Sequence, residues 1–172
     1  TIGSTSGNLS VGGGFLGAQA LKINPANGAQ VNFTGAIGSA AVPTGITKIG
    51  AGSSTLGVSS SAWTGTLTVS QGSLTINGAG ILGGTGAITV NPNATLLVSD
   101  SSATATNNRL GGRAVTTAGG LITLIGNPNS GQSTAETTGA WTFNAGQSVI
   151  TVDADGTAGS TTLTLSSTAA TR

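Results

Sequence analysis

The chain has 172 residues, of which 30 are Gly and only 5% are charged, and its formal net charge is +1. It contains no Cys and no His, which excludes a Ser-His-Asp triad, a cysteine nucleophile and the usual zinc and copper sites. Five basic residues are too few for a surface that tracks nucleic-acid phosphates. No apolar run approaches the roughly 18 residues of a membrane-spanning helix.

Short triplets of the form apolar–x–apolar recur along the chain and predict β-strands, because alternate residues of a strand share one face. No helix is expected, since Gly interrupts almost every ten-residue window and Thr, Ser and Asn favour extended or turn conformations. The middle residue of a triplet, most often Thr, is predicted to point outward and to form ladders with its neighbours. In chain order the predicted strands are 9–11, 21–23, 31–33, 67–69, 74–76, 88–90, 96–98, 122–124, 141–143, 150–152 and 163–165.

The strands belong to an internal repeat. Residues 8–29 align with 73–94, so that Leu9 matches Leu74 and Ile23 matches Val90, at offsets of 65 and 67 residues. The spacing between triplets is near 22, as from 9 to 31, 67 to 88, 74 to 96 and 141 to 163. An offset of three such periods is typical of a solenoid, in which each coil buries its apolar face only by stacking.

We therefore predict an all-β chain that forms one parallel β-helix (β-solenoid) domain over residues 1–172, with about 22 residues per rung and seven or eight rungs. Gly, Asn and Pro between the triplets fit its corners. The alternative is an antiparallel β-sandwich, in which Ser70–Ser73 and Asn144–Ser148 would be hairpin turns.

Residues 46–98 resemble the autotransporter-associated β-strand repeat of bacterial surface proteins. Lys48, Gly50 and Gly52 match the opening of that repeat, residues 65–69 its middle and residues 82–90 its last part. Residues 108–152 are similar to a further piece found in very large members of the group. The resemblance implies a right-handed β-helix that is exported and exposed at the cell surface, with no catalytic residues of its own. The chain departs from the family in being short and in lacking a recognisable C-terminal translocator.

The ionisable residues indicate no site. The acids are Asp100, Glu136, Asp153 and Asp155, scattered singly, so no catalytic, cofactor-binding or metal-binding residue is predicted and no cofactor is expected. Asp153–Gly156 begins like a calcium loop, but the downstream Glu of such a loop is missing, which favours a solvated turn.

Two further groups of residues have alternative interpretations. Arg109 and Arg113 either bond to loop carbonyls or bind an anionic glycan. Trp141 alternates with Phe143 and is expected in the core, whereas Trp63 is harder to place and could stack on sugars if it is exposed.

These observations favour a non-enzymatic, extracellular or cell-surface structural protein: a rod or a filament subunit that self-associates through ladder-competent strands near both ends, such as 9–11 and 163–165. A second hypothesis is an adhesin that presents Trp63 beside Arg109 and Arg113 to surface glycans. A third is a pilin-like sandwich in which residues 1–11 are donated to the next subunit.

Overall fold

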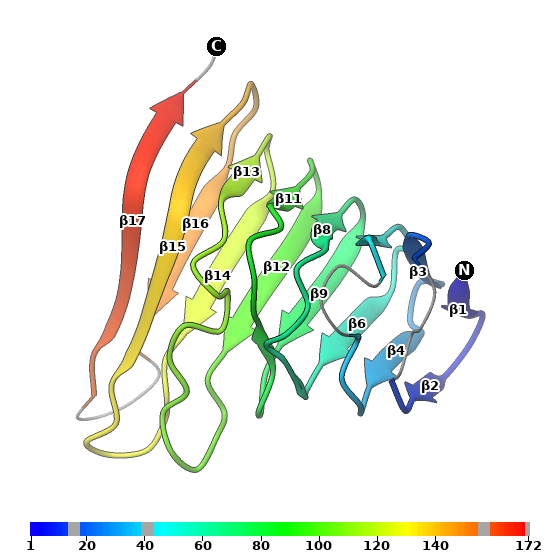
Figure 1. Cartoon of the computed structure of the whole chain (residues 1–172), viewed down its shortest axis with the longest axis horizontal. Coiled ribbons are helices and arrows are strands. Elements are labelled where there is room, and N and C mark those ends of the chain that lie inside the picture. The colour runs from blue at the N-terminus through cyan, green and yellow to red at the C-terminus, as the bar shows by residue number, and fades with distance from the viewer. Residues whose placement is uncertain (14–17, 39–42, 155–158, 171–172) are drawn as a thin grey trace.

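The computed structural model describes residues 1–13, 18–38, 43–154 and 159–170. Residues 168–170 are described by their backbone alone. Every regular element in these ranges is a β-strand (Figure 1). The strands are β1 (Ile2–Ser4), β2 (Asn8–Val11), β3 (Leu21–Pro25), β4 (Gln30–Phe33), β5 (Gly45–Lys48), β6 (Ser53–Leu56), β7 (Ser59–Ser60), β8 (Thr66–Val69), β9 (Gly72–Ile76), β10 (Ile81–Leu82), β11 (Ile88–Val90), β12 (Ala94–Ser99), β13 (Val115–Thr117), β14 (Leu121–Ile125), β15 (Thr134–Phe143), β16 (Val149–Asp153) and β17 (Thr161–Ala170).

The strands stack into a β-solenoid of about seven turns. Sheet A has the order β1-β3-β5-β8-β11-β13-β15-β17 and sheet B the order β16-β14-β12-β9-β6-β4-β2, and the chain alternates between them. Each pairing between described strands is parallel, including the short third side formed by β7 and β10. The sandwich alternative is wrong: residues 70–73 and 144–148 lead from one sheet to the other and close no hairpin, because a parallel ladder requires each strand to pair with the strand one full turn away.

The internal repeat is confirmed as three turns of the solenoid. Ile23 pairs with Lys48, Lys48 with Val69, and Val69 with Val90. On sheet B the same three steps lead from Leu9 to Leu74. All eleven predicted triplets lie in strands, since their alternating pattern needs only one buried face.

The rungs grow longer toward the C-terminus (Figure 1). On sheet A the steps from Ile46 to Leu67 and on to Ile88 are 21 residues, whereas the next two steps, to Val115 and Trp141, are 27 and 26. The spacing of 22 between 141 and 163 is therefore not a turn: Trp141 pairs with Thr168, and Leu163 pairs with Glu136. The extra residues lie in the long connections β12–β13 and β14–β15, which a count of triplets does not detect.

Four strands of the main sheets, β1, β5, β6 and β13, escaped prediction because an inner position is polar. In β1 the second inner residue is Ser4, in β5 it is Lys48, in β6 the first is Ser54, and in β13 the second is Thr117; the last three are buried. The hydroxyl of Thr117 lies 3.0 Å from that of Ser148, so its burial is satisfied by a hydrogen bond. An apolar–x–apolar pattern misses strands whose core position is held by a polar group, whether its hydroxyl is bonded, as in Thr117, or has no partner, as in Ser54.

The corner from sheet A to sheet B demands a left-handed backbone in most rungs. Residues with positive φ stand there in every rung except that of β5 and β6. Gly72 (φ 66°) also packs so closely on the rung below that a Cβ would lie 2.4 Å from the Gly52 carbonyl oxygen. The predicted use of Gly and Asn at the corners is confirmed, with Asn93 (φ 62°) as the non-glycine member.

Candidate functional site

Most of the charged side chains lie inside the solenoid. Lys48, Arg109 and Asp100 are fully buried, and Arg113 and Glu136 are 1% exposed. Lys22 and Asp153 are exposed. Buried charges are rare in proteins unless they are paired or hydrogen-bonded, so the partners of these five residues define what they can do.

Arg109 and Asp100 form the one salt bridge within the described ranges. Arg109 Nη2 lies 2.8 Å from Asp100 Oδ1, and Nη1 donates to the Gly80 carbonyl at 2.9 Å. The other carboxylate oxygen of Asp100 accepts the Thr134 hydroxyl at 2.6 Å and the Thr106 N–H at 3.0 Å. Burial by itself raises the pKa of Asp100, but the hydrogen bonds from Thr134, Arg109 and Thr106 outweigh it and hold that pKa below its ordinary value.

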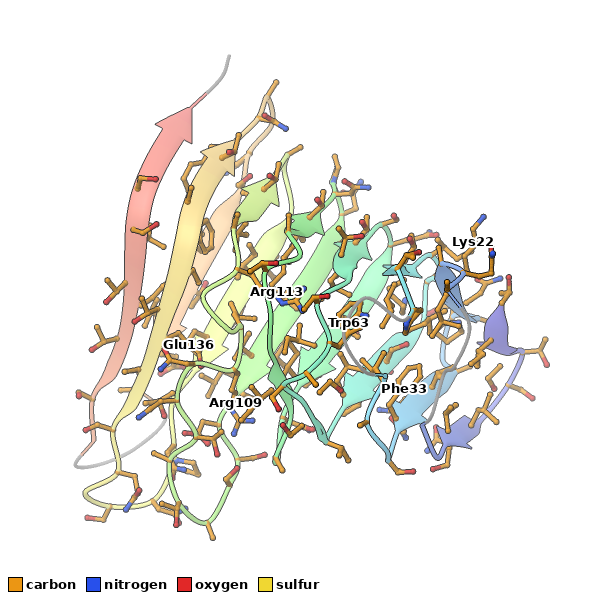
Figure 2. The ribbon with its side chains drawn as sticks, in the orientation of Figure 1. Lys22, Phe33, Trp63, Arg109, Arg113 and Glu136 are labelled. Atoms are coloured by element: carbon orange, nitrogen blue, oxygen red, sulfur yellow. The ribbon has the colours of Figure 1, made fainter. Side chains whose placement is uncertain are left out.

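Glu136 lies beside this pair and binds the main chain of the same loop (Figure 2). Its two carboxylate oxygens accept the backbone N–H groups of Arg109 at 2.7 Å and of Leu110 at 3.1 Å. Burial raises the pKa of Glu136, and the two N–H groups offset this only in part. Both carboxylates therefore hold residues 100–110 against the next rung. Because both carboxylates are buried, they do not form an acid–base pair that solvent can reach.

Arg113 lies against Trp63 inside the solenoid (Figure 2). Its guanidinium carbon is 4.8 Å from the centre of the Trp63 ring, within cation–π range. Its Nη1 donates to the carbonyls of Gly65 at 2.6 Å and Gly86 at 2.8 Å, and its Nη2 to those of Trp63 and Gly83. Because these carbonyls come from two successive turns below, Arg113 ties three rungs together.

Lys48 serves the corner of β5 and β6 in the same manner. Its ammonium donates to the carbonyls of Gly50 and, at 2.9 Å, of Gln71, which belong to the corners of two adjacent rungs. Burial lowers the pKa of Lys48 to about 8. This rung is the one whose corner lacks a positive-φ residue, so the lysine satisfies carbonyls where the backbone turns differently.

The predictions for the aromatic and basic residues have mixed outcomes. Arg109 and Arg113 bond to carbonyls, as one interpretation held. Trp63 does lie beside Arg113, but it is fully buried and donates to the Pro43 carbonyl at 2.7 Å, so the prediction of an exposed Trp63 is wrong. Trp141 is buried in the core as predicted, 5.7 Å from Phe143. Arg113, whose guanidinium lies over the Trp63 ring, is 50 residues away in the chain, so no local pattern signals the burial of Trp63.

Two findings concern metal ions and membranes. Within the described ranges, no group of three or more acidic, Cys or His side chains is placed to hold a metal ion. In the same ranges, no helix is long and apolar enough to cross a membrane. Asp155 and Gly156 of the calcium-like segment lie outside these ranges.

The two ends of the ladder are the remaining functional features. Sheets A and B end on β1 and β2 at one end, the N-terminal edge, and on β17 and β16 at the other, the C-terminal edge. Core side chains there are partly exposed: Val152 is 45% exposed and Ile150 is only partly buried, whereas Leu96 in the middle of sheet B is 0% exposed. Residues 1–11 form β1 and β2, which pair with β3 and β4 of the same chain. In the single chain these residues are thus part of the solenoid, and the sandwich on which the donated-strand hypothesis was built is not formed.

Comparison with known proteins identifies no relative: no protein-family model, curated protein or solved structure matches the chain.

Proposed function

We propose that this chain is a non-enzymatic structural protein of the bacterial cell surface, a solenoid rod that lengthens when further parallel strands stack on its edges. The observation that carries the proposal is the pair of edges: the outermost described strands of both sheets pair on one side only, and their apolar side chains are partly buried. Such edges are templates for another strand. The surface location rests on the resemblance of residues 46–98 to autotransporter repeats.

The bonding of the charged residues also supports a structural role. Lys48, Arg109 and Arg113 are occupied by carbonyls and by one carboxylate, so they are withdrawn from substrates and ligands. A buried ion pair or cation contributes less to stability than its contacts suggest, because desolvation is costly. Its value here is geometric, since each cation fixes the spacing and register of successive rungs.

The test is whether the purified 172-residue chain forms rods that lengthen with concentration. We expect light scattering and electron microscopy to show end-to-end assembly of wild-type chains. Leu9→Lys and Ile150→Lys each place an ammonium at an inward-facing position of one edge strand, which is how natural edges are blocked. Because head-to-tail contact joins unlike edges, either variant alone is expected to stay at one chain, whereas an equal mixture of the two forms dimers through the edges left intact.

Thr123→Lys is the matched control, since Thr123 lies on β14, next to the edge strand β16 in sheet B, with its side chain on the outer face. It is expected to assemble like the wild type. A wild-type chain that keeps the mass of one chain at its highest soluble concentration would overturn the proposal.

A further inference from the structure

One outer column of sheet A is a ladder of five threonines. Thr47 pairs with Thr68, Thr68 with Thr89, Thr89 with Thr116, and Thr116 with Thr142. The five side chains are half-buried and alternate with inner core residues, so the predicted outward Thr ladder is confirmed on this sheet. On sheet B the corresponding column is interrupted, because Thr75 pairs with Leu97. We call the surface around the five threonines the threonine face.

The hydroxyls of this ladder have no hydrogen-bond partner among the described residues. Elsewhere the buried hydroxyls of Thr134, Thr138 and Thr117 are bonded within the protein. Each free hydroxyl can donate one hydrogen bond and accept others. A β-branched side chain has few rotamers in a strand, so the methyl and hydroxyl groups have little freedom and repeat at the strand spacing of about 4.8 Å.

The neighbours of the ladder leave it open and uncharged. Two residues before each threonine stand Gly45, Thr66, Ala87, Ala114 and Ala140, and two residues after stand Ile49, Ser70, Asn91, Ala118 and Asn144. By the alternation of a strand these side chains share the outer face. None carries a charge, and Lys22, at the N-terminal end of the column, is the only charged group in line with it among the described residues.

The chemistry of the threonine face rules out several partners. Charged polymers have nothing to pair with on it. Sugars stack on exposed aromatic rings, but among the described residues Trp63, Trp141 and Phe33 are buried and Phe143 packs, partly buried, against the core. The face spans roughly 19 by 14 Å, on the order of 300 Å², well below the ~800 Å² per partner of a specific protein interface. A dry protein contact would also strip its unpaired hydroxyls of water, at a cost of about 1–3 kcal/mol each.

A partner that leaves every hydroxyl hydrogen-bonded is a lattice of water. The repeat along the ladder is close to the shortest lattice repeat of hexagonal ice, and five rigid hydroxyls with intervening methyl groups present a regular array to it. Each contact is weak, but contacts held in one rigid array act together. We propose that the threonine face binds ordered water and adsorbs to ice. This proposal does not depend on the stacking of rods.

The test is incorporation of the chain into slowly grown ice, together with thermal hysteresis. Wild-type protein is expected to enter the ice and to inhibit its recrystallisation. Thr89→Tyr, in the centre of the ladder, places a ring above the flat array and is expected to reduce incorporation about tenfold. Tyrosine is a good strand residue, and circular dichroism and thermal unfolding report whether each variant keeps the fold.

Thr75→Tyr is the matched control, a half-buried outward threonine on the other sheet, and it is expected to enter ice like the wild type. The proposal is wrong if wild-type protein is excluded from ice, if folded Thr89→Tyr still enters it, or if Thr75→Tyr loses as much. If Thr89→Tyr instead abolishes association between chains that do not enter ice, the face is a protein contact and the proposal also fails. In every case the edge variants Leu9→Lys and Ile150→Lys test rod assembly separately.

Discussion

The stability of this protein is expected to rise with pH across the alkaline range, and Lys48 is the reason. An ammonium whose pKa falls from its ordinary 10.5 to about 8 on folding favours its neutral form in the folded state by on the order of 3 kcal/mol. Between these two values the unfolded chain binds more protons than the folded one. The free energy of unfolding therefore increases with pH, by at most about 1.4 kcal/mol per pH unit for a single proton.

The prediction can be measured up to about pH 9, because the chain contains no Tyr and no Cys and the pKa of Arg113, which burial lowers to about 10, lies above that pH. Urea unfolding of the wild type at intervals from pH 7.5 to 9 is expected to give a steady rise in the free energy of unfolding. Lys48→Met keeps the length of the side chain and removes the titrating group. Its curve is expected to be flat over the same interval, although the carbonyls of Gly50 and Gln71 then lose their donor.

Comparing how the free energy of unfolding of the two proteins changes with pH separates the titration of Lys48 from the effect of the substitution on packing. A constant loss or gain of stability in Lys48→Met at every pH reflects the two carbonyls and the new apolar contacts. The reasoning is refuted if the wild-type free energy of unfolding is flat or falls between pH 8 and 9, or if Lys48→Met retains the rise.

Three more predictions follow from the faces and bonds of the rungs, and urea unfolding at pH 7 measures all of them. Leu96→Ala opens a cavity at a fully buried position and is expected to lower the free energy of unfolding by about 2–5 kcal/mol. Leu97→Ala changes the next residue, which faces outward, and is expected to lower it by about 1 kcal/mol or less. Equal losses would contradict the assigned faces. Asp100→Asn leaves a buried guanidinium unpaired and is expected to cost about 3–5 kcal/mol, and a change near zero would show that the carbonyl bonds alone satisfy it. In Arg113→Lys the shorter ammonium cannot reach all four carbonyls at once, and the free energy of unfolding is expected to fall by about 2 kcal/mol or more. The fluorescence of Trp63 is expected to shift as well. Unchanged fluorescence would argue against the stacked geometry.

The local pattern of the sequence determined the strands and most of their register. Alternation of apolar and small polar residues is a property of neighbouring positions, so each triplet identified its own buried face. The alignment of 8–29 with 73–94 then fixed which strands lie above one another, because a solenoid repeats the same contacts in every turn. Ile23 and Val90 do occupy one inner column, three turns apart.

The tertiary structure decided the places where a polar group occupies an inner position. Lys48 and Thr117 interrupt the apolar pattern of β5 and β13, and each is compatible with the core only because a partner from another rung lies within hydrogen-bond distance. Such partners are 23 and 31 residues away in the chain. Residue pattern within a strand carries no information about them.

The same holds for the charged residues and for the size of the rungs. For Arg109 and Arg113 the sequence favoured loop residues bonded to carbonyls over an anion site, but only the lengthened turns bring those carbonyls and an indole ring around them. A spacing of 22 between Trp141 and Leu163 repeats the period but not the pairing. Sequence by itself determined the period-two faces and the solenoid, since both follow from near neighbours and from repetition. Only the tertiary structure decided which charges are buried, because their desolvation is offset by groups that converge from separate turns.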